Sequence, residues 1–589
     1  MRGVLLSQFM RSILFCLMSA TLVVTGCARA VTLEQKVAAR LQPASDASAP
    51  AEPRVAEIGA TPNNNVAQVS PALAPTPVEP PIDPYALPLH LPGPATRIVA
   101  RDARITTLSR KNEKYPTYDA YRTIAQWAVE DGNYDEAARN YRVEAAMYRK
   151  KGDSDAAMIE EMKASRYDTD VRLFADRDVT DAEFKAMYSG ALLEPPVGCY
   201  VGAFIDRDEQ LEHNYQDENW QTHRLGDEFT QLVAKPHASY FMYVGYGQRF
   251  PRRWVEECKK ENAIPQIAWE PTNLHDVNDD DYLNGWAKAC AAEDWPILIR
   301  YASEMNGFWT PYHSDPKLYI QKFQLVHRVL HHYAPRVATI WCVNNPPLNN
   351  LMDYYPGDDS CDWVGLNFYS VPFYDNDPSR SAAQDSPIAL LDPVYRMFAA
   401  RKPIAICEYA ASHMAAADHL LRNDLAIDKL SQLYTALPRL YPRVKLIDWF
   451  DMDNLRNAEA GRQLNNYNVT EQAPVLAAYR DAIKSPYFLS QLQFMSDPRP
   501  QMPRPLLSGQ QVHGFVRFSV WVKTYVARPK IYFKVGSSLI YASNRPGANT
   551  IDIDTRSIPV GNVPITVYVY DNHNRFITSS STSVTVLHG

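Results

Sequence analysis

Two glutamates in this sequence stand where a pair of carboxyl groups could act on one substrate. Glu304 lies in RYASEMNGFW (300–309), which places an arginine, a glutamate, an asparagine and a tryptophan behind a short apolar run. Glu408 is the last residue of a second apolar run, KPIAICE (402–408). One glutamate at the end of a strand is usually an ion-pair partner. Two of them among aromatic residues favour acid–base and nucleophilic chemistry on a glycosidic bond.

The elements that must position these glutamates are eight short apolar runs, which alternate with helical patterns between 195 and 487. The runs are VGCYVGAF, ASYFMYVG, IPQIAWE, PILIRYAS, VATIWCVN, DWVGLNFY, KPIAICE and VKLIDWF. Apolar strands that alternate with helices predict a parallel sheet whose outer face is covered. Eight such units favour a closed (β/α)8 TIM barrel. A doubly wound open sheet is the alternative, but no glycine-rich phosphate loop follows the first run.

In such a barrel, functional groups gather at the carboxyl ends of the strands. We therefore expect Glu304 and Glu408, at the ends of the fourth and seventh strands, to face each other across the barrel mouth. Arg300 lies four residues before Glu304 on the same predicted strand, so both side chains should point to one face. The remaining predicted strand ends carry Trp269 with Glu270, Asn344, Tyr369 and Trp449.

Residues 195–487 resemble glycoside hydrolase family 26, the family of β-mannanases and some mixed-linkage β-glucanases. The resemblance rests on RYASEMNGFW, YYPGDDSCDWVGLNFY (354–369) and KPIAICEYA (402–410), in that order. It implies a retaining enzyme without metal or cofactor, with Glu304 as general acid/base and Glu408 as nucleophile. It also implies that Tyr369 hydrogen-bonds the nucleophile, that Arg300 keeps the carboxylate cluster charged, and that Trp309 lines the sugar cleft.

The chemistry of a retaining enzyme fits these roles. The two carboxyl groups must lie about 5 to 5.5 Å apart. At that separation, ionised Glu408 raises the pKa of Glu304 and keeps it protonated for donation. Tryptophan rings stack on the apolar face of a pyranose. The candidate substrate-binding residues are therefore Arg300, Trp309, Tyr369, Trp269, Asn344 and Trp449, with ordinary packing as the alternative for the tryptophans.

Ser303 departs from the family pattern, because the mannanases carry a histidine directly before the acid/base. A β-1,3-1,4-glucan or a related exopolysaccharide thus becomes at least as strong a candidate substrate as β-mannan. The expected activity is endo-acting cleavage of a β-linked polysaccharide. The alternatives are a non-catalytic polysaccharide-binding or exopolysaccharide-assembly lipoprotein and a structural envelope protein.

The N-terminus predicts a lipoprotein signal peptide over residues 1–26. Two arginines precede the apolar stretch SILFCLMSATLVV, which is short for a bilayer span and ends in VTGC. VTGC resembles the bacterial lipobox, which implies lipidation of Cys27 with acyl chains such as palmitate. An uncleaved signal anchor is the alternative. Because alanine follows Cys27, we expect the outer membrane of the cell envelope. Residues 27–100 read as a disordered tether, with 13 prolines between 41 and 100.

The flanks of the barrel show two further patterns. Residues 101–190 have helical periodicity, and EDGNYDEAARNYRVEA resembles half of a tetratricopeptide repeat without a second copy. We expect a helical hairpin packed on the next region; an array that binds an envelope or polysaccharide-export protein is the alternative. After a linker at 488–504, residues 505–589 alternate with period two, as in VRFSVWVK, and predict an immunoglobulin- or fibronectin-like β-sandwich. That domain could bind sugar or act as a spacer.

The composition excludes some classes of protein. The net charge is -7 and the chain has no long basic run, so the signature of a nucleic-acid binder is missing. The 35 tyrosines and 11 tryptophans are typical of polysaccharide-processing proteins. The cysteines beyond Cys27 match neither a zinc site nor a redox pair, so we expect mostly buried thiols, with one or two disulfides at most.

Overall fold

The computed structural model describes residues 83–96, 102–495 and 501–588. All of them belong to one compact unit that spans residues 82–589. The predicted signal peptide, Cys27 and most of the predicted tether lie outside the described residues. Among the helices that are described, none combines the length and the apolar character that a bilayer crossing requires.

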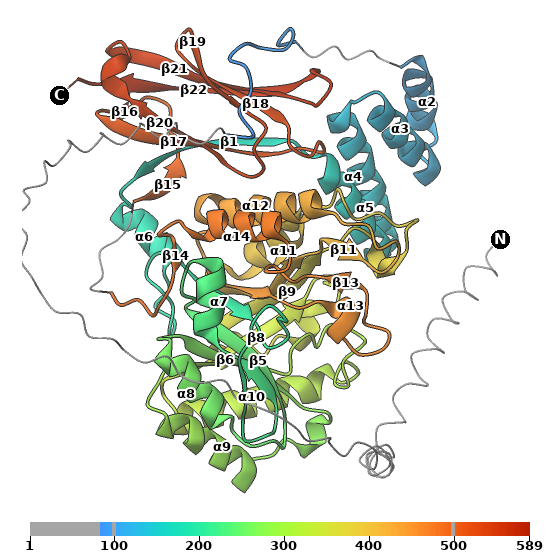
Figure 1. The fold of residues 1–589 in the computed structure, drawn as a ribbon. Coiled ribbons are helices and arrows are strands. Elements are labelled where there is room, and N and C mark those ends of the chain that lie inside the picture. The colour runs from blue at the N-terminus through green and yellow to red at the C-terminus, as the bar shows by residue number, and fades with distance from the viewer. Residues whose placement is uncertain (1–82, 97–101, 496–500, 589) are drawn as a thin grey trace, which may run out of the picture. The chain divides into compact units, whose positions relative to one another are not determined.

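Eight parallel strands close into a barrel (Figure 1). In chain order they are β2 (Cys199–Phe204), β5 (Ser239–Gly245), β6 (Ile264–Glu270), β7 (Ile297–Tyr301), β8 (Val337–Asn344), β9 (Trp363–Ser370), β10 (Ile404–Ala411) and β12 (Val444–Phe450). Strand β12 pairs in parallel with β2 and closes the ring. Each of the eight predicted apolar runs overlaps one of these strands, so the predicted barrel is confirmed. A short strand, β14 (Phe488–Leu489), pairs with β2 in addition.

Helices lie between the strands and cover the outside of the barrel. They are α7 (Gly226–Val233), α8 (Arg252–Lys260), α9 (Asp281–Ala292), α10 (Pro316–Tyr333), α11 (Pro387–Phe398), α12 (Asn423–Leu440) and α14 (Ala473–Ile483). The sequence of α10 shows why a helix forms here. Asp315 caps its N-terminus by accepting a hydrogen bond from the Leu318 N–H at 3.0 Å, and proline stands at its first position. Its buried residues, among them Tyr319, Phe323 and Leu330, recur at helical spacing and face the sheet.

The N-terminal described region contains more helices than the predicted hairpin. Four helices follow one another: α2 (Ala103–Lys114), α3 (Tyr118–Glu130), α4 (Tyr134–Lys151) and α5 (Ser154–Tyr167). After them come β1 (Asp170–Arg177) and the short helix α6 (Asp181–Met187). The prediction of a single hairpin over 101–190 is therefore corrected to four helices, a strand and a further helix.

Two sheets hold the C-terminal strands, and their pairings are antiparallel except that β16 pairs in parallel with β22. One has the order β15-β1-β17-β20 and the other the order β16-β22-β21-β18-β19. Their bounds are β15 (Met502–Pro505), β16 (Gln510–Val512), β17 (Phe515–Lys523), β18 (Lys530–Val535), β19 (Ser538–Ser543), β20 (Asn549–Asp554), β21 (Gly561–Tyr570) and β22 (Phe576–Val586). Side chains from both sheets, such as Phe518 and Phe533, share one apolar core.

The boundaries of this C-terminal region differ from those predicted. Strand β1, from the predicted helical region, pairs with β17, and β15, from the predicted linker, pairs with β1. The end of the predicted tether is also ordered. Leu87 N–H donates to the Ala542 carbonyl at 2.9 Å, and the Tyr570 hydroxyl donates to the Gly93 carbonyl at 3.1 Å. These pairings join segments hundreds of residues apart, which local periodicity cannot reveal.

Candidate active site

Glu408 is surrounded by hydrogen-bond donors at the mouth of the barrel. It lies in β10 and its side chain is buried. The Tyr243 hydroxyl of β5 donates to its Oε1 atom at 2.6 Å, and the Tyr369 hydroxyl of β9 donates to Oε2 at 2.5 Å. Arg300 Nη2 lies 2.6 Å from Oε1. Two hydroxyl donors and the paired cation complement a negative charge on this carboxylate.

Arg300 is the buried cation of the site. It belongs to β7 and is 0% exposed. Its guanidinium lies over the rings of Phe241 and Tyr243, at 5.1 and 5.5 Å from their centroids. Burial alone would lower the pKa of Arg300, but the charge of Glu408 raises this pKa well above its usual range. The arginine therefore stays charged and places a positive charge directly beside the Glu408 carboxylate.

Glu304 has a different environment, which favours the protonated carboxyl group. Its Oε1 atom accepts a hydrogen bond from Asn367 Nδ2 at 2.8 Å, and Oε2 accepts one from Trp309 Nε1 at 2.7 Å. Burial and then the charge of Glu408 raise the pKa of Glu304, while these two donors oppose the rise. The site thus pairs a carboxyl group suited to donate a proton with one held beside a cation.

The backbone around Glu304 corrects one prediction. Strand β7 ends at Tyr301, so Glu304 lies beyond the strand, and the same-face argument for Arg300 and Glu304 was wrong. Ala302 (φ 46°) and Glu304 (φ 58°) both adopt the left-handed conformation, which is costly for residues with a Cβ atom. The Glu304 N–H donates to the Cys342 carbonyl of β8 at 2.9 Å. A strained turn anchored to the next strand, rather than strand alternation, therefore aims this side chain.

Asn367 links the two halves of the site. Its Nδ2 atom donates to Glu304, and its Oδ1 atom accepts a weak hydrogen bond from Arg300 Nη1 at 3.4 Å. Sequence reasoning missed Asn367, although it stands two residues before Tyr369 on one strand, where side chains share a face. Tyr243 was also missed. Its stretch, SYFMYVG, carries no signal that separates it from the buried Tyr240.

A third carboxyl group supports the Glu304 turn. Glu270, the last residue of β6, accepts hydrogen bonds from the Ser303 N–H at 3.1 Å and from the Tyr312 hydroxyl at 2.7 Å. Burial raises the pKa of Glu270 to about 7. Glu270 thereby holds Ser303, the residue directly before Glu304. Sequence reasoning noted Glu270 at a strand end but gave it no role.

Three predicted substrate-binding residues lie outside this cluster. Trp269 is fully buried and stacks on Trp286 with ring centroids 4.0 Å apart. Trp449 is also fully buried, and its Nε1 atom donates to the Tyr467 carbonyl at 3.1 Å. Because neither ring offers a free face, both are corrected to packing residues. The Asn344 side chain donates to the Pro346 carbonyl at 2.6 Å, so it orders its own loop.

One group of potential metal ligands occurs among the described residues. It consists of His327 and His331 of α10 with Asp362. Asp362 directly precedes β9, at the end of the barrel opposite Glu304, and accepts hydrogen bonds from His331 at 2.9 Å and from the Thr339 N–H at 2.7 Å. This group cannot assist the carboxylate pair. The six described cysteines are buried free thiols.

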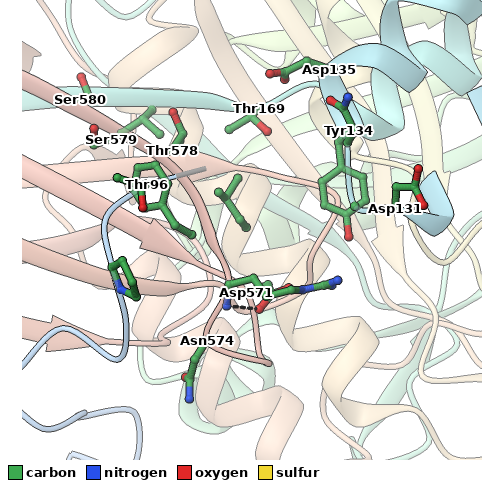
Figure 2. A pocket seen from close by; sticks show the side chains of 17 residues that line it. Thr96, Asp131, Tyr134, Asp135, Thr169, Asp571, Asn574, Thr578, Ser579 and Ser580 are labelled. Carbon is green, nitrogen blue, oxygen red and sulfur yellow. Dashed lines mark hydrogen bonds and ion pairs between the residues drawn. The ribbon is translucent and has the colours of Figure 1, made fainter. Parts of the chain in front are cut away.

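A cavity of about 650 Å³ lies away from the barrel mouth. Figure 2 shows the side chains that line it. Its walls come from the turn between α3 and α4 and from the start of β22, with Tyr134 and Asp571 among the lining residues. Arg575 Nε donates to Asp571 at 2.6 Å, and the Arg575 and His573 N–H groups donate to it as well. These bonds hold the Asp571 carboxylate within the turn between β21 and β22, so it is not a candidate catalytic group.

The family match to known proteins covers the middle of the barrel region. Residues 274–385 match the family model of glycosyl hydrolase family 26; the matched segment includes Glu304 and Asn367, whereas Glu408 lies beyond it. The β-1,3-xylanase TXYA of a Vibrio species is 30% identical over 98 residues, which are 15% of this chain and 20% of that protein. Mannan endo-1,4-β-mannosidase A of a Piromyces species is 26% identical over 111 residues, which are 19% of this chain and 17% of that protein.

These matches are short relative to the proteins concerned. The chain spans about a fifth of the length of the curated relatives it matches. Among solved structures, a modular endo-β-1,4-mannanase of Cellulomonas fimi is 14% identical, with a TM-score of 0.37 over 69% of this chain and 98% of that one.

Proposed function

We propose that this protein is a retaining, endo-acting β-glycoside hydrolase that cleaves a β-linked polysaccharide. The observation that carries the proposal is the linked pair of carboxyl groups at the barrel mouth. Glu408 is held by Arg300 and two tyrosine hydroxyls, while the pKa of Glu304 is raised. That division of roles is what double displacement by two carboxyl groups requires.

In the proposed mechanism, Glu408 attacks the anomeric carbon while Glu304 donates its proton to the departing glycosidic oxygen. The product of this step is a glycosyl ester on Glu408 and a Glu304 carboxylate. Glu304 then removes a proton from water, and the water oxygen displaces Glu408 to regenerate both groups. Tyr243 and Tyr369 orient the nucleophile, and Trp309 stands beside the acid, where its ring can line the sugar cleft.

The proposed substrates are β-mannan, β-1,3-1,4-glucan or a related exopolysaccharide. Ser303 in place of the mannanase histidine keeps the β-glucans in this group. The matched relatives are named for β-1,3-xylan and β-mannan, which adds β-1,3-xylan to the substrates worth testing.

The test is cleavage of these polysaccharides by the full chain and by Glu304→Ala and Glu408→Ala. We expect new reducing ends with the wild type and a loss of more than a thousandfold in kcat for each variant. The matched control is Glu209→Gln. Glu209 accepts a hydrogen bond from Arg456 at 3.1 Å in the loop that follows β2, outside the carboxylate cluster, so activity should persist.

Azide distinguishes the two roles and separates hydrolysis from binding alone. With an activated glycoside, azide should rescue Glu408→Ala and yield the glycosyl azide of inverted configuration. It should rescue Glu304→Ala and yield the azide of retained configuration. A protein that binds these polysaccharides without cutting any of them would instead be the non-catalytic assembly lipoprotein.

We also propose that Cys27 is acylated and that the chain is anchored in the bacterial cell envelope, at the outer membrane. The support is the VTGC motif and the residue after it. Labelling with a palmitate analogue should mark the wild type and not Cys27→Ser. Helices α2 to α5 are the proposed contact for an envelope or polysaccharide-export protein, which cross-linking in cells would capture.

A further inference from the structure

An aromatic ring stands on the rim of the barrel without any part in the chemistry above. Trp220 is 81% exposed, more than any other large hydrophobic side chain among the described residues. It lies at the tip of a hairpin formed by β3 (Asn214–Gln216) and β4 (Thr222–Arg224), in the loop that follows β2. We propose that Trp220 is an outlying stacking platform for a pyranose ring of the polysaccharide, an inference that rests on the proposed function.

The hairpin tip is joined to the rim that carries the carboxyl groups. Asn219 and Arg249 exchange two hydrogen bonds of 2.9 Å, and Gln221 Nε2 approaches Gln248 Oε1 at 3.4 Å. The same Gln248 oxygen accepts a hydrogen bond from the N–H of Gly245, the last residue of β5, at 2.6 Å. Tyr243, two residues earlier, donates to Glu408. A chain of direct contacts therefore runs from the nucleophile to the Trp220 tip.

The conformation of Trp220 is costly and is imposed by its neighbours. Its φ is +62°, a left-handed value that bulky side chains rarely adopt. Asp217 enforces the turn: its carboxylate accepts hydrogen bonds from the Asn219 and Gln221 N–H groups at 2.8 and 2.9 Å, and its carbonyl accepts one from Trp220. A strained backbone and an exposed indole ring both oppose stability, so a use for the exposed ring accounts for them together.

The base of the hairpin is fixed as well. His223 is fully buried, with Nδ1 2.8 Å from Asp206 and Nε2 3.5 Å from Asp217. Its ring also packs near Trp254 of α8. A ring presented by so rigid a support loses little conformational freedom when a ligand binds, which favours affinity.

The surroundings of Trp220 indicate a sugar rather than a protein as its ligand. The residues that flank Trp220 at the hairpin tip, Glu218, Asn219 and Gln221, are all polar, whereas protein interfaces are marked by broad apolar patches. One apolar face with polar groups beside it matches a pyranose, which has a C–H face and equatorial hydroxyls. The position predicts a cleft that continues outward past β5 and binds long chains better than short ones.

The experiment compares wild type, Trp220→Ala and Trp220→Gly on β-mannan, lichenan and β-1,3-xylan. For the polysaccharide that is cleaved, KM should rise about three- to tenfold in both variants, the range expected for one aromatic contact. The rate on a short aryl glycoside should not change. In a Glu408→Gln background, retardation in native gels that contain the polysaccharide should weaken to the same extent.

Thermal unfolding distinguishes the proposed platform from a purely structural role for Trp220. Because glycine adopts positive φ without strain, Trp220→Gly should unfold at the same or a higher temperature than the wild type while it loses affinity. Phe515→Ala removes another exposed ring, 78% exposed on β17, and should change neither property. Equal KM and retardation for wild type and Trp220→Ala would overturn the platform. Weakened retardation without cleavage by any form would overturn hydrolysis and leave the platform standing.

Discussion

Gly307 lies against the Trp309 ring, and its replacement by alanine tests whether the hydrogen bond from that ring supports Glu304 as the general acid. A Cβ atom at residue 307 would stand 2.3, 2.4 and 2.6 Å from the Cζ2, Cε2 and Cη2 atoms of Trp309. Carbon atoms that are not bonded prefer about 3.5 to 4.0 Å. The ring must therefore move by about 1 Å or more. Since Trp309 is 39% exposed, it can move into solvent, and the loss of stability should be small.

The same movement breaks the 2.7 Å hydrogen bond from Trp309 Nε1 to Glu304. Glu304 becomes charged as it donates its proton, and a hydrogen bond to a charged group contributes about 1.5 to 3 kcal/mol. We therefore expect kcat/KM of Gly307→Ala to fall by about 10- to 100-fold. Trp309 lowers the pKa of Glu304 against burial and Glu408, which raise it. Without that donor the pKa of Glu304 rises, so the alkaline limb of the pH–rate profile should move to higher pH.

The assay is kcat/KM against pH on the cleaved polysaccharide, with thermal unfolding in parallel. Trp309→Phe keeps a ring but removes the N–H, and it should shift the alkaline limb in the same direction. Gly285→Ala is the matched control, because an added Cβ in α9 would meet nothing within 4 Å. If Gly307→Ala keeps the wild-type rate and limb while it folds, the assigned role of Trp309 is wrong.

Three further changes test the buried charges. Arg300→Met should lower the free energy of unfolding by about 3 to 5 kcal/mol, because Glu408 would be left buried without its cation. Adding Glu408→Gln should recover most of that free energy but no activity. Additive losses of stability in urea unfolding would contradict the pairing of Arg300 with Glu408. The pKa of Glu270 is raised from 4.5 to about 7, so its contribution to stability is present below pH 4.5 and is lost as pH rises through about 7. Glu270→Gln should remove that slope from unfolding temperatures measured against pH. Burial lowers the pKa of His223, but Asp206 and Asp217 raise it above 6.5 overall, so its contribution to stability is present below pH 6.5 and is lost as pH rises through the raised value. His223→Gln should flatten this second slope. An unchanged slope would refute a stabilising role for the contacts of His223 with Asp206 and Asp217.

The sequence by itself determined the barrel and its two principal carboxyl groups. Strands that are buried on both faces must be apolar throughout, and the helices between them must be amphipathic, so both patterns are local and legible. Glu304 and Glu408 stood out because each charged side chain follows an apolar run. The repeat of eight units then placed both at one end of the barrel.

Only the tertiary structure decided how these groups are connected. Asn367 and Tyr243 look like ordinary strand residues until the closed ring brings them against the glutamates. Trp269 and Trp449 look like sugar-binding residues until their rings are seen to be fully buried. Each of these outcomes depends on which strands and helices become neighbours in space. Periodicity reports the two faces of one element, whereas contacts between elements depend on pairing over hundreds of residues, as β1 and β17 also show.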